Sequence, residues 1–251
     1  IREQVLRGIA GNRLAGLHFA GYFLNLDEPR VAGETVSMPL GDGPHCRHAN
    51  GELDVTALCL LADSALATAT RCRMTPGARL ATLHLGMQFT GVPAIGPVHA
   101  DAHFLGTADG TAVPQLMSTA TLFASGRVVC HASAEFGALN PPPGVSLAPL
   151  PWEQTQPQPP APADVKSLDA HERAILKACN TALVRTSPET SFIQRFWGGL
   201  PKPGARGASI RFAVGPHIGN RVGHVQGGIS VGVAARCASA AAPAHMMLSN
   251  V

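Results

Sequence analysis

Hydrophobic residues recur with a helical period in two places near the start of the chain. Residues 53–71 form a stretch of helical length in which leucine and alanine cover nearly the whole circumference. A helix that is apolar on all sides must be enclosed on most of them, so we expect this helix at the centre of the fold. Thr75-Pro76-Gly77 should end it, and residues 3–14 predict a shorter amphipathic helix before it.

Strand-like runs flank the enclosed helix, one before it and four after it. They lie at residues 30–40, 80–89, 98–107, 113–124 and 127–136. The first contains β-branched residues, and the last alternates after a Ser-Gly hairpin turn. One strand, one enclosed helix and four antiparallel strands is the order of a hotdog fold, an α+β architecture in which a curved sheet wraps around a long central helix.

A proline-rich segment divides the chain. Nine of the 21 prolines fall between residues 140 and 166, a composition that favours an extended, semi-rigid linker. The rear part then begins the same order again. It predicts an amphipathic helix at 170–184, a strand at 208–214, a loop at 215–223, a second apolar helix at 226–242 and the start of a strand at 245–251. We therefore interpret the chain as an internal repeat.

Composition narrows the classes of function. With 45% hydrophobic and 14% charged residues the chain can bury a full core. A net charge of +3 without a basic cluster argues against nucleic acid as a partner. The six cysteines form no close pair, which indicates buried thiols rather than disulfides or zinc. Polar residues interrupt the apolar stretches and no secretory signal precedes them, so we expect a cytoplasmic protein without membrane contact.

The loops before the two apolar helices share a pattern with the same internal spacing. In the front part it reads His48-x-x-Gly51-x-x-Asp54-Val55-Thr56, and in the rear part Asn220-x-x-Gly223-x-x-Gln226-Gly227-Gly228. Each position of the first pattern is separated from its counterpart by one constant offset, so both loops lead into their helices at equivalent points. Matching spacing over two such segments supports the repeat interpretation.

The rear pattern resembles the Asn-x-x-Gly-x-x-His-Gly-Gly segment of PaaI-like hotdog acyl-CoA thioesterases. In that family an aspartate lies nine residues after the motif histidine, inside Leu-Ala-Asp. Here Asp63 ends a Leu-Ala-Asp sequence nine residues after Asp54, whereas Ala235 stands nine residues after Gln226. The resemblance covers nearly the whole chain apart from the linker. It implies a double hotdog with one repeat at 1–139, a linker at 140–166 and a second repeat at 167–251.

The resemblance also implies a composite site, because family members pair the carboxylate of one hotdog with the helix amides of its partner. The intact combination here is Asp63 with Asn220, Gly227 and Gly228. Thr82 stands near the place where the family has a hydroxyl beside the aspartate. Gln226 stands where the family has histidine, and the central helices, at 53–72 and 226–242, should lie side by side. The opposite combination, of His48, Val55 and Ala235, has no chemically active group.

The chemistry fits these residue types. The first N–H groups of a helix lack intrahelical partners, and glycine lets a carbonyl approach them closely. A carboxylate among leucine, alanine and cysteine is costly unless another group compensates its charge. Asp63 would act as general base toward water or attack the thioester directly. Asn220 would hold the water or the carbonyl, with space for both between the carboxylate and the amides of Gly227 and Gly228.

Simpler interpretations remain open at this stage. Asp63 would pair with Arg71 or Arg127 if it were structural. The histidines of the two loops, including His45 and His48, lack metal-site spacing, so we expect no metal and no cofactor. A non-catalytic acyl-thioester-binding module is the alternative function. An enoyl-CoA hydratase is less favoured. The resemblance to hydratases of this fold is weaker, because they have an aspartate followed five residues later by a histidine, whereas Asp63 of this chain is followed at that distance by Thr68.

We expect acyl-CoA, or an acyl carrier, as the partner of the site, and a homo-oligomer of double-hotdog units. The second repeat contains only the beginning of its sheet. We therefore expect further strands beyond residue 251, or a neighbouring chain that completes the sheet. Because the first residue is not methionine, we expect trimming at the front as well.

Overall fold

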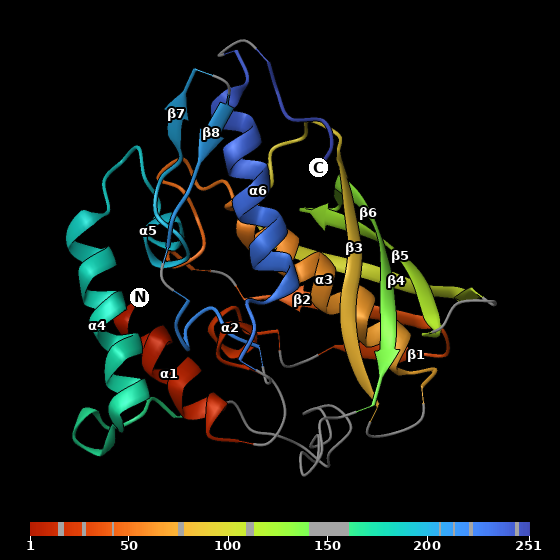
Figure 1. The fold of residues 1–251 in the computed structure, drawn as a ribbon, viewed down its shortest axis with the longest axis horizontal. Helices are drawn as coiled ribbons and strands as arrows, with labels where there is room; N and C mark the ends of the chain where they lie inside the picture. Colours follow the sequence, from red (N-terminus) through yellow and green to blue (C-terminus); the bar gives the residue numbers. More distant parts are fainter. Residues whose placement is uncertain are drawn as a thin grey trace.

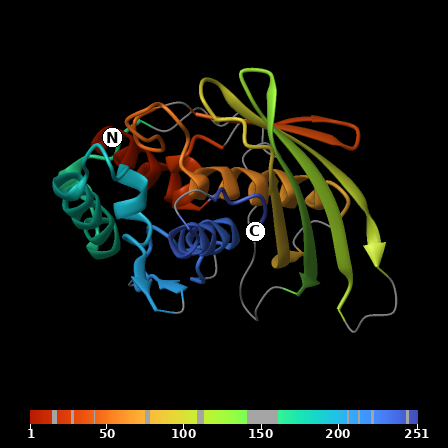
Figure 2. The same cartoon turned by 90° about the horizontal axis from the view of Figure 1, so that it is seen from above.

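The first half of the chain contains a curved six-stranded antiparallel sheet and one long helix (Figures 1 and 2). The structure is a computed structural model. It describes residues 1–14, 18–26, 29–41, 43–74, 78–108, 113–140, 161–205, 207–212, 214–220, 223–243 and 246–251. Most of the predicted linker and the predicted helix stop at Thr75-Pro76-Gly77 lie outside these residues.

The sheet has the strand order β1-β2-β4-β5-β6-β3. Its strands are β1 (Arg30–Ala32), β2 (Thr35–Leu40), β3 (Arg79–Phe89), β4 (Val98–Ala108), β5 (Gln115–Ala124) and β6 (Arg127–Leu139). The predicted strands are confirmed, except that the first run is two strands. Gly33 separates them with a φ of +62°, which glycine adopts without a steric penalty. Along β5, fully buried and half-buried residues alternate, so that one face of the sheet covers the helix.

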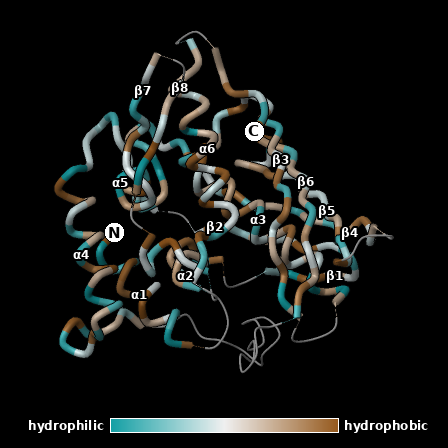
Figure 3. Tube along the Cα trace, in the orientation of Figure 1, coloured by the Kyte–Doolittle hydropathy of each residue, from teal (hydrophilic) through white to brown (hydrophobic). Residues whose placement is uncertain are grey.

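Helix α3 (Val55–Arg71) is the enclosed helix, on the concave side of the sheet. Asp54 caps it, because its Oδ1 atom accepts a hydrogen bond from the Thr56 N–H at 2.8 Å. Leu60, Leu61 and Leu66 are fully buried, which confirms the prediction of an enclosed helix. Figure 3 shows the hydrophobic stretches of this part of the chain running through the middle of the molecule.

The remaining helices lie mostly away from the sheet. They are α1 (Arg2–Asn12), α2 (Phe19–Phe23), α4 (Ala170–Arg185), α5 (Phe192–Phe196) and α6 (Gly227–Ala241), with a short 3₁₀ turn, η2 (Val165–Ser167). Two of them, α5 and α6, contact α3. The predicted helices at 3–14, 170–184 and 226–242 are confirmed in type and place. None of the described helices has both the length and the hydropathy required to cross a membrane.

The predicted strand at 208–214 is only partly correct. Strand β8 (Gly207–Ser209) ends early and pairs with β7 (Lys202–Gly204) in a two-stranded hairpin. Among the described residues its only strand partner is β7, which is three residues long. The backbone beyond Ser209 therefore has no neighbouring strand with which to form sheet hydrogen bonds.

Helix α6 lies beside α3, as predicted, and two glycines set the distance of approach (Figure 2). A Cβ atom on Gly228 would lie 2.5 Å from the Leu60 Cα, and one on Gly232 would lie 2.5 Å from the Thr56 Cα. Side chains at either position would collide with the α3 backbone. The two helices therefore touch through their main chains.

The last residues of the chain lie along the outer edge of β3. The Met87 N–H donates to the Val251 carbonyl at 2.7 Å, the Val251 N–H donates to the Met87 carbonyl at 3.0 Å, and the Phe89 N–H donates to the Ser249 carbonyl at 2.7 Å. The predicted strand start at 245–251 is confirmed over its last residues, while residue 245 lies outside the described part.

Candidate active site between helices α3 and α6

The buried carboxylate of Asp63 joins three elements. Asp63 lies in the middle of α3 and is 2% exposed. Its Oδ1 atom accepts a hydrogen bond from the Thr82 hydroxyl of β3 at 3.0 Å, and its Oδ2 atom accepts one from the Gly228 N–H of α6 at 3.0 Å. The helix and strand of the first half thus meet the start of α6 at one carboxyl group.

Glycine makes this contact possible. A Cβ atom on Gly227 would lie 2.9 Å from the Thr82 Oγ1 and 3.1 Å from the Asp63 Oδ2. With no side chain at Gly227 or Gly228, the first turn of α6 presents its backbone to the carboxylate. The first amides of a helix carry partial positive charge and favour a negative group. Asp63 is therefore bound by a helix N-terminus.

Burial raises the pKa of Asp63, while hydrogen bonds from Thr82, Gly228 and Gln226 lower it in part. The net effect is a pKa above the usual carboxyl value, which makes the ionised group a stronger base than an exposed aspartate. The ion pairs formed by the described residues do not include Asp63. The structural alternative, in which Arg71 or Arg127 neutralises it, is therefore not what the structure shows.

Gln226, the residue before α6, extends the cluster to the front of the chain. Its amide nitrogen lies 3.3 Å from the Nε2 atom of His18. His18 in turn caps α2, because its Nδ1 atom accepts a hydrogen bond from the Gly21 N–H at 3.2 Å. Sequence reasoning missed His18. Its signal was a polar residue directly before a short apolar run, which is the position of a helix cap.

Asn220 contributes a side-chain hydrogen bond to the loop before α6. Its side-chain oxygen accepts a hydrogen bond from the His224 N–H at 3.0 Å, so it shapes the loop before α6. The structure thus brings together Asp63, Thr82, Gln226, Gly227 and Gly228 and holds Asn220 within the loop.

The carboxylate is closer to the helix than the sequence analysis expected. A 3.0 Å hydrogen bond joins Asp63 to the Gly228 N–H directly, so no space for a carbonyl and a water exists between these two groups. The physical reason is that a buried carboxylate takes the nearest donor. A substrate carbonyl must displace Asp63 from the Gly228 amide before it can use that donor.

A second polar cluster lies around His48, at the place where the sequence analysis expected no chemically active group. Asp54 is fully buried, and its Oδ2 atom lies 3.3 Å from the His48 Nε2 and accepts a hydrogen bond from the Ser191 hydroxyl at 3.2 Å. Burial raises the pKa of Asp54, but His48, the charge of Arg236 and the Thr56 amide lower it overall. The Asp54 hydrogen bond in turn raises the pKa of His48. The sequence analysis did not predict the contact between Asp54 and His48, because it considered Asp54 only as the counterpart of a motif histidine.

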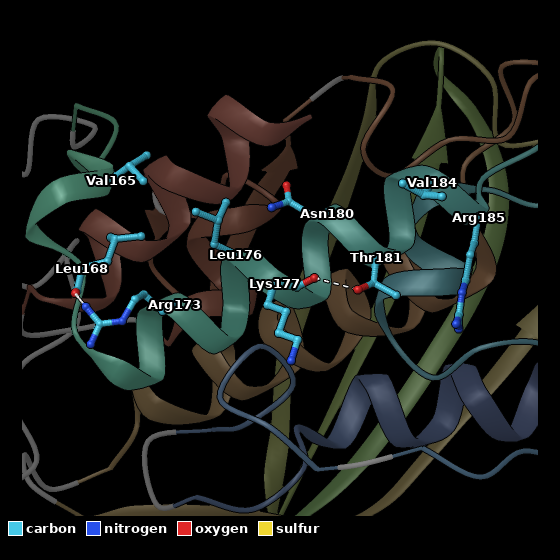
Figure 4. Close-up of a pocket in the computed structure, with 9 residues that line it drawn as sticks. All are labelled: Val165, Leu168, Arg173, Leu176, Lys177, Asn180, Thr181, Val184 and Arg185. Atoms are coloured by element: carbon cyan, nitrogen blue, oxygen red, sulfur yellow. Dashed lines mark hydrogen bonds between the residues drawn. The ribbon is translucent and has the colours of Figure 1, made fainter.

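A groove of about 670 Å³ runs along α4, apart from both clusters (Figure 4). It combines apolar and cationic side chains. Its lining residues are Val165, Leu168, Arg173, Leu176, Lys177, Asn180, Thr181, Val184 and Arg185. None of them belongs to the Asp63 or Asp54 cluster, so the groove is a separate surface feature.

Two histidines of the loops, His45 and His217, pack against aromatic rings. His45 lies edge-on to the ring of Phe23, with centroids 4.9 Å apart, and His217 lies over Phe196 at 5.0 Å. Burial lowers the pKa of His217 to about 4. Within the described residues, no group of three or more His, Cys, Asp or Glu side chains is arranged to hold a metal ion.

No protein-family model and no curated protein matches the chain. Solved structures similar to it include a thioesterase family protein from Silicibacter pomeroyi, at 19% identity and a TM-score of 0.40, over 56% of this chain and all of that one (100%). A Bacillus halodurans protein crystallised with CoA is similar at 13% identity and a TM-score of 0.46, over 55% of this chain and 91% of that one.

A phenylacetic acid degradation-related protein from Ralstonia eutropha is similar at 16% identity and a TM-score of 0.42, over 53% of this chain and 98% of that one. Each similarity therefore spans about half of this chain. At such distances these similarities assign no activity to the chain, and its function has to be argued from its own residues.

Proposed function

We propose that the chain hydrolyses acyl thioesters such as acyl-CoA at the Asp63 cluster. The observation that carries this proposal is the buried, basic carboxylate of Asp63 held against the first amides of a helix that begins with two glycines. Thioester hydrolysis needs a base or nucleophile on one side of the carbonyl and hydrogen-bond donors on its oxygen. The Asp63 carboxylate and the Gly228 N–H would supply these two groups, and they are in direct contact.

In the proposed reaction the thioester carbonyl takes over the hydrogen bond of the Gly228 N–H. A water oxygen attacks the carbonyl carbon, Asp63 removes the proton from that water, and the sulfur leaves as a thiol after receiving the proton. Alternatively, the carboxylate attacks the carbonyl itself, the C–S bond breaks and the sulfur leaves as a thiolate. Water then hydrolyses the resulting anhydride, which releases the acyl group as an acid and restores Asp63, and the thiolate takes up a proton from that water. In either case a prepositioned amide at the developing oxyanion contributes roughly 3–4 kcal/mol.

We further propose that the two halves are tandem copies of one fold unit. Support comes from the order of elements, because α1, α2, β1, β2 and α3 of the first half correspond to α4, α5, β7, β8 and α6 of the second. Strands β1 and β7 begin at positions 30 and 202, and helices α3 and α6 begin at positions 55 and 227. Both pairs of starting positions are separated by the same offset.

The loops before α3 and α6 support the same correspondence in their hydrogen bonds. The His48 N–H donates to the Glu52 carbonyl at 2.8 Å, and the Asn220 N–H donates to the His224 carbonyl at 2.7 Å. Gly51 and Gly223 have φ values of +82° and +78°. Each of these pairs has the same separation along the chain as the two helix starts.

Contacts between the halves are reciprocal, as expected for a two-fold relation. Gly228 approaches the Leu60 backbone while Gly232 approaches the Thr56 backbone, and the offset relates Thr56 to Gly228 and Leu60 to Gly232. Such reciprocity supports a composite site, in which Asp63 comes from one copy and the glycine amides from the other.

The test is a hydrolysis assay that follows thiol release from a panel of acyl-CoA esters, from acetyl to palmitoyl and aromatic acyl groups. Asp63→Asn keeps the size of the side chain but removes its basicity. We expect kcat to fall by roughly 10²–10⁴, with a much smaller change in KM. Asp101→Asn, on the outer face of β4, is the matched control and should retain wild-type turnover.

Two results would contradict the proposal. Wild-type protein that binds acyl-CoA without releasing thiol would favour the non-catalytic binding module. Folded Asp63→Asn protein with near-normal kcat would show that the carboxylate has a structural role only.

A further inference from the structure

Two side chains that precede helices meet beside the Asp63 cluster. Gln226 stands directly before α6, and its amide group ends 3.3 Å from the Nε2 atom of His18. His18 stands directly before α2, and its Nδ1 atom accepts a hydrogen bond from the Gly21 N–H at 3.2 Å. The two nitrogens of one imidazole ring therefore connect the start of α2 to the start of α6.

A contact of the same kind occurs at the other long helix. Asp54 stands directly before α3, and its Oδ2 atom accepts a hydrogen bond from the hydroxyl of Ser191, which caps α5. Asp54 also accepts the Thr56 N–H of its own helix. In contrast, the side chain of Gln226 accepts no hydrogen bond from the helix it precedes, all of which belongs to the described residues. The second end of the Gln226 amide is therefore available to the neighbouring cluster.

The hydrogen bonds of His18 determine how the Gln226 amide is oriented. A neutral imidazole has one N–H donor and one acceptor. Because Nδ1 accepts the Gly21 N–H, the proton of the ring lies on Nε2. With the amide nitrogen of Gln226 on Nε2, two donors would face each other. A half-turn of the amide, which exchanges two ends of nearly the same shape, gives the Nε2–H an oxygen as acceptor and directs the NH2 group away from the ring.

Asp63 lies where this NH2 group can donate. Gln226 is followed by Gly227, where a Cβ atom would lie 3.1 Å from the Asp63 Oδ2, and by Gly228, whose N–H donates to the same oxygen at 3.0 Å. A hydrogen bond from Gln226 is also one of the contacts that lower the pKa of Asp63. Only the nitrogen end of an amide can donate to a carboxylate, so this contact requires the same orientation as the contact with His18.

We propose that His18 is a positioning residue for the reaction at Asp63. Its Nε2–H holds the carbonyl oxygen of Gln226, and the Gln226 NH2 group then donates to the Asp63 carboxylate. This inference rests on the proposed function. In the proposed reaction a substrate carbonyl takes the Gly228 N–H from Asp63, and the Gln226 NH2 group remains to hold the carboxylate in place.

The experiment compares His18→Asn with the wild type. Asparagine retains an atom that can cap α2 but has none at the position of Nε2. The Gln226 amide then loses its fixed orientation and donates less to Asp63, so the pKa of Asp63 should rise. The acidic limb of the kcat/KM profile should move up by roughly 0.4–1 pH units, the equivalent of one hydrogen bond. His84→Asn, exposed on β3, is the matched control and should keep the wild-type profile.

A second variant tests whether His18 acts through Gln226. Gln226→Met keeps the length of the side chain and removes both of its hydrogen-bonding ends. It should move the acidic limb as His18→Asn does, and the double variant should move it no further. Additive shifts, or an unchanged limb in either single variant, would overturn the proposal. Gln226→Met leaves the cap of α2 intact, so it decides the question even if His18→Asn does not fold.

NMR of the full chain tests the orientation without turnover. Nitrogen spectra should show neutral His18 protonated at Nε2 and unprotonated at Nδ1, and a proton on Nδ1 would overturn the proposal. A carbon titration of the Asp63 carboxyl group should show the same upward shift in His18→Asn. If both NMR results appear but no thiol is released from acyl-CoA, the proposed function fails and the contact of Gln226 with Asp63 stands. If Asp63-dependent hydrolysis occurs without them, the role of His18 alone fails.

Discussion

At Asp63, burial and hydrogen bonding act on one carboxyl group in opposite directions. Burial raises its pKa, and the Thr82 hydroxyl is the largest of the contributions that lower it. The balance keeps the group ionisable in an apolar setting while leaving it more basic than an exposed aspartate. Thr82 therefore limits how far the pKa rises in the carboxyl group that the proposed reaction uses.

Thr82→Val tests this tuning. The substitution keeps the branched shape and removes the donor, so the pKa of Asp63 should rise further. If ionised Asp63 is the base, the acidic limb of the kcat/KM profile should move to higher pH, measured with one good acyl-CoA substrate. Thr121→Val on β5, whose hydroxyl contacts His131, provides the comparison. A profile that stays in place, or moves to lower pH, would argue against Asp63 as the base.

The sequence predicted individual residues where a motif had a fixed spacing. Asp63, Thr82 and Gly228 meet as expected because each holds a definite place relative to a helix or strand start. His18 and Arg236 were not predicted, because each reaches its cluster from a segment that is remote from its partner along the chain. Spacing along a sequence carries no information about which distant side chain turns toward a site.

At the scale of elements, the crossing of α3 and α6 depends on the absence of two side chains. Gly232→Ala would place a Cβ atom 2.5 Å from the Thr56 Cα. We expect a loss of roughly 1–3 kcal/mol in the free energy of unfolding, as for an overpacked core, measured by urea denaturation. Ser239→Ala, exposed near the end of α6, should change stability little. If the Gly232→Ala protein were as stable as the wild type, α3 and α6 could move apart without a loss in the free energy of unfolding.

Long periodic elements were predicted well and short ones poorly. Helix α3 and strands β5 and β6 have enough residues for a period to show. Helices α2 and α5 are five residues each, too short to display one. They are fixed instead by capping side chains, His18 and Ser191, and by aromatic packing between the two segments, in which the rings of Phe23 and Phe196 lie 5.5 Å apart.

At the scale of the whole molecule, residues 249–251 cover the edge of the sheet. Removing residues 249–251 would expose the Met87 and Phe89 amides, which donate to Val251 and Ser249. We expect these two amides to exchange hydrogen faster in the shortened chain, while amides between β5 and β6 keep their protection. Association of the shortened chain through the free edge is a further expected result. Equal exchange in both proteins would show that this pairing is not formed in solution.

The contact between Asp63 and Gly228 has a consequence for the order of events during turnover. The amide that would polarise a substrate carbonyl is the same amide that lowers the pKa of the carboxyl group. When a carbonyl oxygen takes that N–H, Asp63 loses one of the donors that hold it in its resting state, and its proton affinity increases. In the proposed reaction the arrival of the substrate therefore activates the base. Without substrate the same amide keeps the carboxylate less basic, so its full reactivity develops only when a carbonyl is in place.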